Sequence, residues 1–171
     1  MKKISALVIA ISFLLFSCQK EVVTDNSALE AVATTSMNKN KQLSFKSEYQ
    51  TSSQILQPAP ILISRITGTG TAPFLGQSTF VAVSTANFTT APPFQIGGTA
   101  TFTAANGDEF YTTFTGTAIP NGQGALNIRM AHTITSGIGR FTDISGSFVG
   151  YTVAVPGHAS GTITYEGKIS F

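Results

Sequence analysis

Residues 161–171 read GTITYEGKISF, and the alternation within this stretch indicates a β-strand with one wet face. Ile163, Tyr165, Ile169 and Phe171 fall on one side of an extended chain, whereas Thr, Glu, Lys and Ser side chains fall on the other. Upstream, similar runs recur between turns that contain Gly, Pro and Asn. This pattern predicts an all-β fold.

A hairpin is predicted around Asn106-Gly107. Runs at 98–105 and 109–117 flank this dipeptide, which favours a type I′ turn because that turn needs a positive φ angle at both central residues. Phe102 on the first strand and Phe110 on the second can then share a core side.

About eight strands are expected in the domain from residue 44 to residue 171. Besides the hairpin, the predicted runs are 44–50, 61–67, 77–88, 125–135, 141–155 and 159–171. Long runs joined by short turns favour an antiparallel up-and-down β-barrel, which has no free edge strand. An open sandwich is the alternative architecture. A transmembrane barrel is disfavoured, because its lipid-facing side should be an apolar band and here it would carry many Thr and Ser residues.

The start of the chain predicts export. Lys2 and Lys3 precede an apolar run at 4–16 that is too short for a comfortable bilayer span and is typical of a signal peptide. Leu15-Phe16-Ser17-Cys18 then resembles the lipobox of bacterial lipoproteins, in which the cysteine is acylated and becomes the new N-terminus. We therefore expect a signal peptide at 1–17 and a lipid on Cys18, rather than a conventionally cleaved signal with an ordinary cysteine.

Residues 18–43 are predicted to be the acylated cysteine and a disordered polar tether between the membrane and the barrel. This organisation places the protein in the bacterial cell envelope, in the outer membrane, on its periplasmic face or on the cell surface. Gln19-Lys20-Glu21 resembles a surface-display signal of some Gram-negative lineages, but a solvated spacer explains it equally well. Cys18 is the sole cysteine, so the domain can hold no internal disulfide.

Charge and composition exclude several classes of partner. Only 11% of residues are charged, and the net charge of +2 comes from Lys2 and Lys3. Nucleic-acid binding is therefore not expected. A G-x-S-x-G elbow, a phosphate loop, an H-E-x-x-H motif, paired cysteines and EF-hand spacing are all absent from the sequence, and the two histidines have no metal-ligand spacing. We expect no cofactor and no metal.

The turns of the predicted barrel resemble landmarks of a known group. The stretches 68–76, 104–109, 113–116 and 134–141 are similar to those of small bacterial barrels with the calycin-like architecture of allene oxide cyclases and dirigent proteins. The resemblance covers roughly residues 61–171 and implies the fold. It implies no activity, because members range from isomerase-like enzymes to proteins that steer radical coupling.

Three residues are candidates for ligand binding. His132 continues the apolar face of residues 126–134 and is expected to point into the barrel, as a ligand-binding or proton-transferring group or as a hydrogen-bonded core histidine. Arg140 could clamp a carboxylate or, more often for such a residue, pair with a nearby acid and pin a loop. Tyr111 is a further proton-transfer candidate, as is Glu48. His158 is expected in an exposed turn.

Three functions remain open at this level. The first is a non-enzymatic envelope lipoprotein whose barrel binds a small apolar molecule or another envelope component. The second is an isomerase or cyclase acting inside the barrel, and the third is a structural or adhesive surface protein. A barrel filled with phenylalanine side chains would remove the internal cavity that the enzyme requires. Homo-oligomers are common among such barrels, but no interface pattern stands out.

Overall fold

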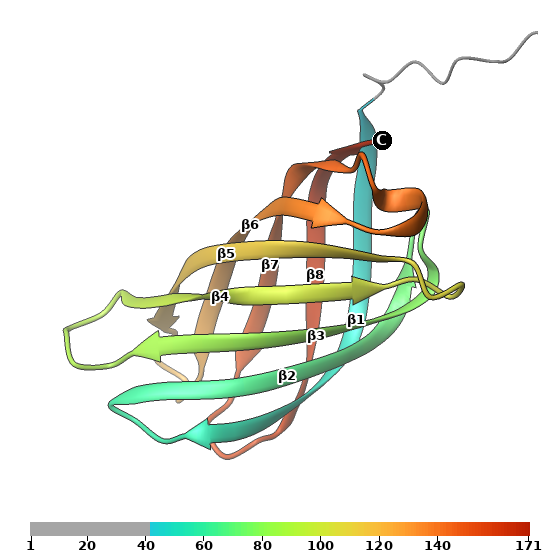
Figure 1. Ribbon diagram of the computed structural model, residues 1–171. Coiled ribbons are helices and arrows are strands. Elements are labelled where there is room, and N and C mark those ends of the chain that lie inside the picture. Colours follow the sequence, from blue (N-terminus) through green and yellow to red (C-terminus); the bar gives the residue numbers. More distant parts are fainter. Residues whose placement is uncertain (1–41) are drawn as a thin grey trace, which may run out of the picture. The chain divides into compact units, whose positions relative to one another are not determined.

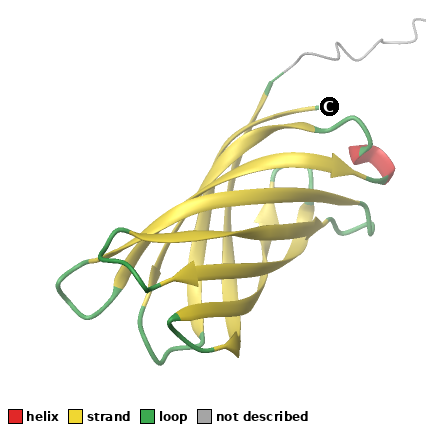
Figure 2. Cartoon of the chain, turned by 60° about the vertical axis from the view of Figure 1, so that its left-hand side comes forward, coloured by secondary structure: helices red, strands yellow, loops and turns green. Residues whose placement is uncertain are grey.

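The computed structural model describes residues 42–171. The predicted signal peptide, Cys18 and nearly all of the predicted tether lie outside the described residues. The described strands are β1 (Leu43–Gln57), β2 (Ile61–Ala72), β3 (Gly76–Asn87), β4 (Phe94–Thr103), β5 (Glu109–Pro120), β6 (Leu126–Gly137), β7 (Ser145–Ala154) and β8 (Ser160–Ser170). A short 3-10 helix, η1 (Gly139–Phe141), lies between β6 and β7 (Figure 2).

The eight strands form a closed antiparallel barrel in chain order (Figure 1). Each strand pairs with the next, and β1 closes the barrel against β8, with Phe45 opposite Gly167 and Tyr49 opposite Ile163. The predicted up-and-down barrel is therefore confirmed. The open sandwich is excluded, because no edge strand is left between β1 and β8.

Several strand boundaries differ from the prediction. β1 continues from Gln50 to Gln57, because its second half, which is mostly polar, pairs with β2. The run predicted at 141–155 is not one strand, since Phe141 ends η1 and β7 begins only at Ser145. In both places pairing with a neighbouring strand sets the boundary, and the local alternation does not reveal it.

The type I′ turn predicted at Asn106-Gly107 is wrong. Gly107 has a φ of 86°, but Asn106 does not have a positive φ. The amide of Gly107 donates to the carbonyl of Ala104 at 2.9 Å, and the amide of Ala104 donates to the carbonyl of Asp108 at 2.8 Å. The connection is thus a hairpin loop of more than two residues. A tight turn spans residues 104–107, and Gly107 at its end has a left-handed backbone conformation.

Aromatic side chains fill the barrel interior. Phe102 on β4 stacks on Phe110 of β5, with ring centroids 4.8 Å apart and planes 9° from parallel. The ring of Phe80 lies over Gly68, and the ring of Tyr165 lies over Gly150, so that a β-carbon at either glycine would collide with the ring. The buried ring-bearing residues of this core are Phe45, Tyr49, Phe80, Phe102, Phe110, Phe114, His132, Phe141, Phe148 and Tyr165. The interior is therefore a packed core of the kind that small barrels form.

The outer face of the barrel is mainly polar. Its exposed strand positions include Lys46, Glu48, Arg65, Thr67, Thr79, Thr99, Thr113, Thr115, Arg129, Thr133, Glu166 and Lys168. This pattern is not the continuous apolar band expected of a lipid-facing barrel wall. Among the described residues, no helix has the length and apolar character needed to cross a bilayer.

Candidate functional site

His132 lies inside the barrel, as its alternation on β6 predicted. Its side chain is 2% exposed, and its ring is sandwiched between Phe114 and Phe148, each with its ring centroid 4.8 Å away. The edge of the imidazole faces Tyr165, whose ring centroid lies 5.3 Å away at 88°. His132 is therefore part of the aromatic core.

One polar partner orients the imidazole of His132. Thr112 Oγ1 lies 3.1 Å from His132 Nδ1 and donates to the carbonyl of Ala100 at 3.4 Å. Because the Thr112 hydroxyl has only one proton, this arrangement favours the tautomer in which Nδ1–H donates to Thr112. Nε2 is then a buried acceptor, and it has no hydrogen-bond partner. Burial lowers the pKa of His132 from 6.5 to about 4, so the ring is neutral at physiological pH.

Tyr111 and Glu48 lie on the outside of the barrel. The hydroxyl of Tyr111 donates to Glu109 Oε2 at 2.9 Å, and Thr103 donates to the other carboxylate oxygen at 3.1 Å. The hydrogen bond to Glu109, followed by burial, raises the pKa of Tyr111. Glu48 is exposed on β1. The wall of the barrel thus separates both residues from His132.

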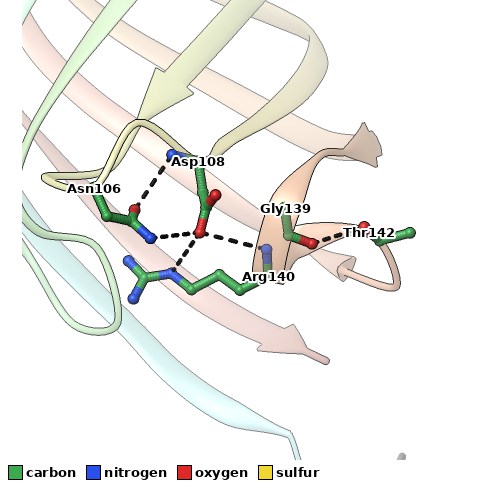
Figure 3. Close-up of polar contacts among 5 residues, drawn as sticks. All are labelled: Asn106, Asp108, Gly139, Arg140 and Thr142. Atoms are coloured by element: carbon green, nitrogen blue, oxygen red, sulfur yellow. Dashed lines mark hydrogen bonds and ion pairs between the residues drawn. The ribbon is translucent and has the colours of Figure 1, made fainter.

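Arg140 holds two loops together (Figure 3). Its guanidinium Nε lies 3.6 Å from Asp108 Oδ2. The same carboxylate accepts from the backbone amide of Arg140 at 3.4 Å and from the side-chain amide of Asn106 at 2.6 Å. Asp108 therefore ties the β4–β5 loop to the start of η1, which matches the loop-pinning role expected for Arg140. The acid, Asp108, comes from another hairpin.

The close approach of Asp108 to Gly139 gives a testable prediction for this loop contact. Gly139 has a φ of 64°, and a β-carbon there would collide with the Asp108 carboxylate. We expect Gly139→Ala to lower the free energy of unfolding by about 2–3 kcal/mol, from left-handed strain of roughly 1–2 kcal/mol plus the displaced carboxylate. Urea denaturation measures this loss.

Gly122→Ala is the matched control, because Gly122 has a φ of 76° and open space around it. It should show the conformational strain alone. In an Asp108→Ala background the cost of Gly139→Ala should fall to the Gly122→Ala value. Equal costs for the two glycines in the natural background would mean that the Asp108 contact contributes nothing.

Sequence reasoning missed a second polar contact within the core. Tyr49 Oη and Ser78 Oγ lie 2.8 Å apart, and burial raises the pKa of Tyr49. Ser47, on the same face of β1, is buried and its hydroxyl has no hydrogen-bond partner. Alternation with Phe45 places Ser47 and Tyr49 inside, so the inward direction was readable, but Ser78 as the partner depends on strand order.

Two hollows among the described residues lie on the outside of the barrel. One, of about 580 Å³, is lined by Tyr151 and Val153 of β7 together with threonines of β8. Another, of about 510 Å³, lies beside Lys46, Glu48 and Glu166. Tyr151 and Val153 are among the exposed large apolar residues, at 44% and 54%.

The predicted candidates do not form one site. His132 lies in the core, Tyr111 on the outer wall, and Arg140 in an end loop; His158 is exposed in the β7–β8 turn. Within residues 42–171, no cluster of His, Cys, Asp and Glu could hold a metal ion. Comparison of the chain with protein-family models, curated proteins and solved structures gave no match.

Proposed function

We propose that this chain is a lipid-anchored protein of the bacterial cell envelope, and that its barrel binds another envelope component through its outer surface. Binding through the outer surface is supported by the aromatic packing of the barrel interior. A ligand inside would have to displace rings such as Phe102 and Phe148, which are buried and 5.6 Å apart between centroids. The likeness to allene oxide cyclase and dirigent barrels belongs to this proposal and concerns architecture alone.

The lipid anchor rests on the sequence around Cys18. A cationic start, a short apolar run and a small residue before the sole cysteine are together the features of a lipoprotein leader. Outer-membrane residence is part of the same proposal.

The anchor is tested by metabolic labelling with an alkyne-bearing fatty acid in a host with lipoprotein processing enzymes. Full-length protein should be labelled and recovered with membranes, whereas Cys18→Ser should lose at least about 90% of the label, because two or more acyl chains are needed for stable anchoring. Ser17→Ala is the matched control, since it retains the cysteine and a small residue before it. Label retained in Cys18→Ser would contradict the proposal.

A small apolar ligand bound on the outside is a second candidate, favoured by the hollow beside Tyr151 and Val153. Native mass spectrometry of the protein purified from its own host tests for such a bound ligand. A reproducible added mass that Val153→Ser removes would support the outer ligand site. An added mass that survives Val153→Ser but is lost on core substitution would contradict the filled interior.

A further inference from the structure

The two ends of the barrel differ in their relation to the rest of the chain. In an up-and-down barrel, the start of β1 and the end of β8 lie together, and Leu43 pairs with Ile169. The loops 73–75, 104–108 and 138–144 share this end, which we call the chain-entry end (Figure 1). The chain that leads back to Cys18 joins the barrel here.

Two large exposed apolar side chains lie at the chain-entry end. Phe74 is 41% exposed and Ile138 is 49% exposed, each at a loop tip. Phe74 packs edge-on against Phe171, at 5.6 Å between centroids, and Phe171 packs against the buried Phe141 at 5.8 Å. The exposed ring of Phe74 is thus supported by Phe171 and, through it, by the core.

Phe74 adopts its position at a backbone cost. Its φ of 68° makes it the single non-glycine residue with a positive φ among the described residues. Glycine would adopt this conformation without the roughly 1–2 kcal/mol that a side chain costs. Strained residues of this kind cluster at functional sites, including sites that hold a ligand.

The loops of the chain-entry end carry the charged residues Asp108, Arg140 and Asp143, and the first two form an ion pair. Asp108 is paired with Arg140, so its negative charge is compensated, and the Arg140 guanidinium lies 4.9 Å from the centroid of the Phe141 ring. The exposed Arg140 lies in the same loop as the exposed Ile138, and apolar side chains beside a cation suit the boundary between lipid headgroups and acyl chains.

We infer that the chain-entry end rests on the bilayer that holds the lipid anchor, with Phe74 and Ile138 inserted at the headgroup level. This inference rests on the proposed lipidation of Cys18. The far end of the barrel also carries exposed apolar residues, including Ile55 at 64%. Reaching the bilayer with that end would require the linker to run back along the barrel, whereas the chain-entry end needs no such extension. Covalent attachment makes the contact intramolecular, so a small apolar rim suffices.

The chain contains no tryptophan, so a single introduced tryptophan reports its own surroundings. The full acylated protein is reconstituted in phosphatidylethanolamine and phosphatidylglycerol vesicles with acyl chains brominated near the headgroup. Phe74→Trp and Ile138→Trp should lose about half or more of their fluorescence relative to unbrominated vesicles, as expected of aromatic side chains at the interface. Ile55→Trp, at the far end, is the matched control and should be quenched far less, because its side chain lies at the opposite end of the barrel from the proposed contact.

Flotation of the same samples tests the lipid anchor separately from the contact of the barrel end with the bilayer. Protein that floats with vesicles while both chain-entry tryptophans stay unquenched would overturn the membrane contact and leave the anchor intact. Quenching of Ile55→Trp as strong as that of Phe74→Trp would also overturn it. Failure to float would overturn the anchor and the contact together. Two chain-entry positions guard against one variant failing to fold.

Discussion

Phe102→Ala is expected to lower the free energy of unfolding by about 4 kcal/mol, the largest effect of any single substitution considered for this barrel. Phe102 is fully buried on β4. Its ring contacts those of Phe110, Phe80, Tyr165, Phe148, Tyr49 and His132, at centroid distances between 4.8 and 6.3 Å. Truncation removes both the buried apolar surface and these contacts, and the surrounding rings are held by strands that cannot close the gap. Urea denaturation with an unchanged slope would measure the loss.

Thr99→Ala is the control for this change on the same strand. Thr99 faces outward and is exposed, so its loss should cost less than about 1 kcal/mol, mainly through β-propensity. A cost for Phe102→Ala that is no greater than this would show that the centre of the barrel is loosely filled. The proposal of an outer binding surface would then lose its main support, and an internal ligand would have to be reconsidered.

The barrel itself could be predicted because its alternation is regular on the strands that carry the core. The last strand was expected at 159–171 and is found at Ser160–Ser170, with Ile163, Tyr165 and Ile169 buried as the pattern requires. β1 was expected to end at Gln50, since the polar residues 51–54 interrupt the apolar alternation. Its continuation depends on pairing with β2 along residues 51–57, and that pairing is a tertiary feature which no local window contains.

The candidate site was predictable residue by residue, but its grouping was not. The inward direction of His132 followed from its alternation with Met130 and Ile134, and burial of all three confirms it. The contact of Arg140 with Asp108 joins residues 32 positions apart. One signal could have suggested it: in an up-and-down barrel the β4–β5 and β6–β7 loops lie at the same end, which brings an acid from one loop near a base from the other.

Acidification is expected to destabilise the barrel through His132. The pKa of His132 falls from 6.5 to about 4 because burial disfavours the imidazolium. Between these two pH values the unfolded chain binds a proton that the folded barrel does not, so the free energy of unfolding decreases as pH falls. The stabilisation that depends on neutral His132 is fully present above pH 6.5. As pH falls below 6.5 it decreases by about 1.4 kcal/mol per pH unit, so that the total loss at pH 4 is about 3 kcal/mol.

His132→Phe separates this effect from the titration of carboxylates. The new ring can occupy the space between Phe114 and Phe148, and Thr112 keeps its hydrogen bond to the carbonyl of Ala100. Urea denaturation of both proteins at pH 7, 6 and 5 should show natural protein losing about 2 kcal/mol more than His132→Phe over this range, since the carboxylate contributions cancel in the difference. At pH 7 the variant should be as stable as the natural protein or more so, because it removes the unpartnered Nε2.

His158→Ala serves as the second control, because His158 is exposed in the β7–β8 turn and its loss should leave the pH dependence in place. Parallel pH profiles for the natural protein and His132→Phe would contradict the expectation. They would mean that the folded barrel accepts a proton on His132 as readily as the unfolded chain does. With Phe114 and Phe148 covering both faces of the ring, that requires water or a polar group to reach Nε2, so the interior would have to open on a timescale that allows protonation.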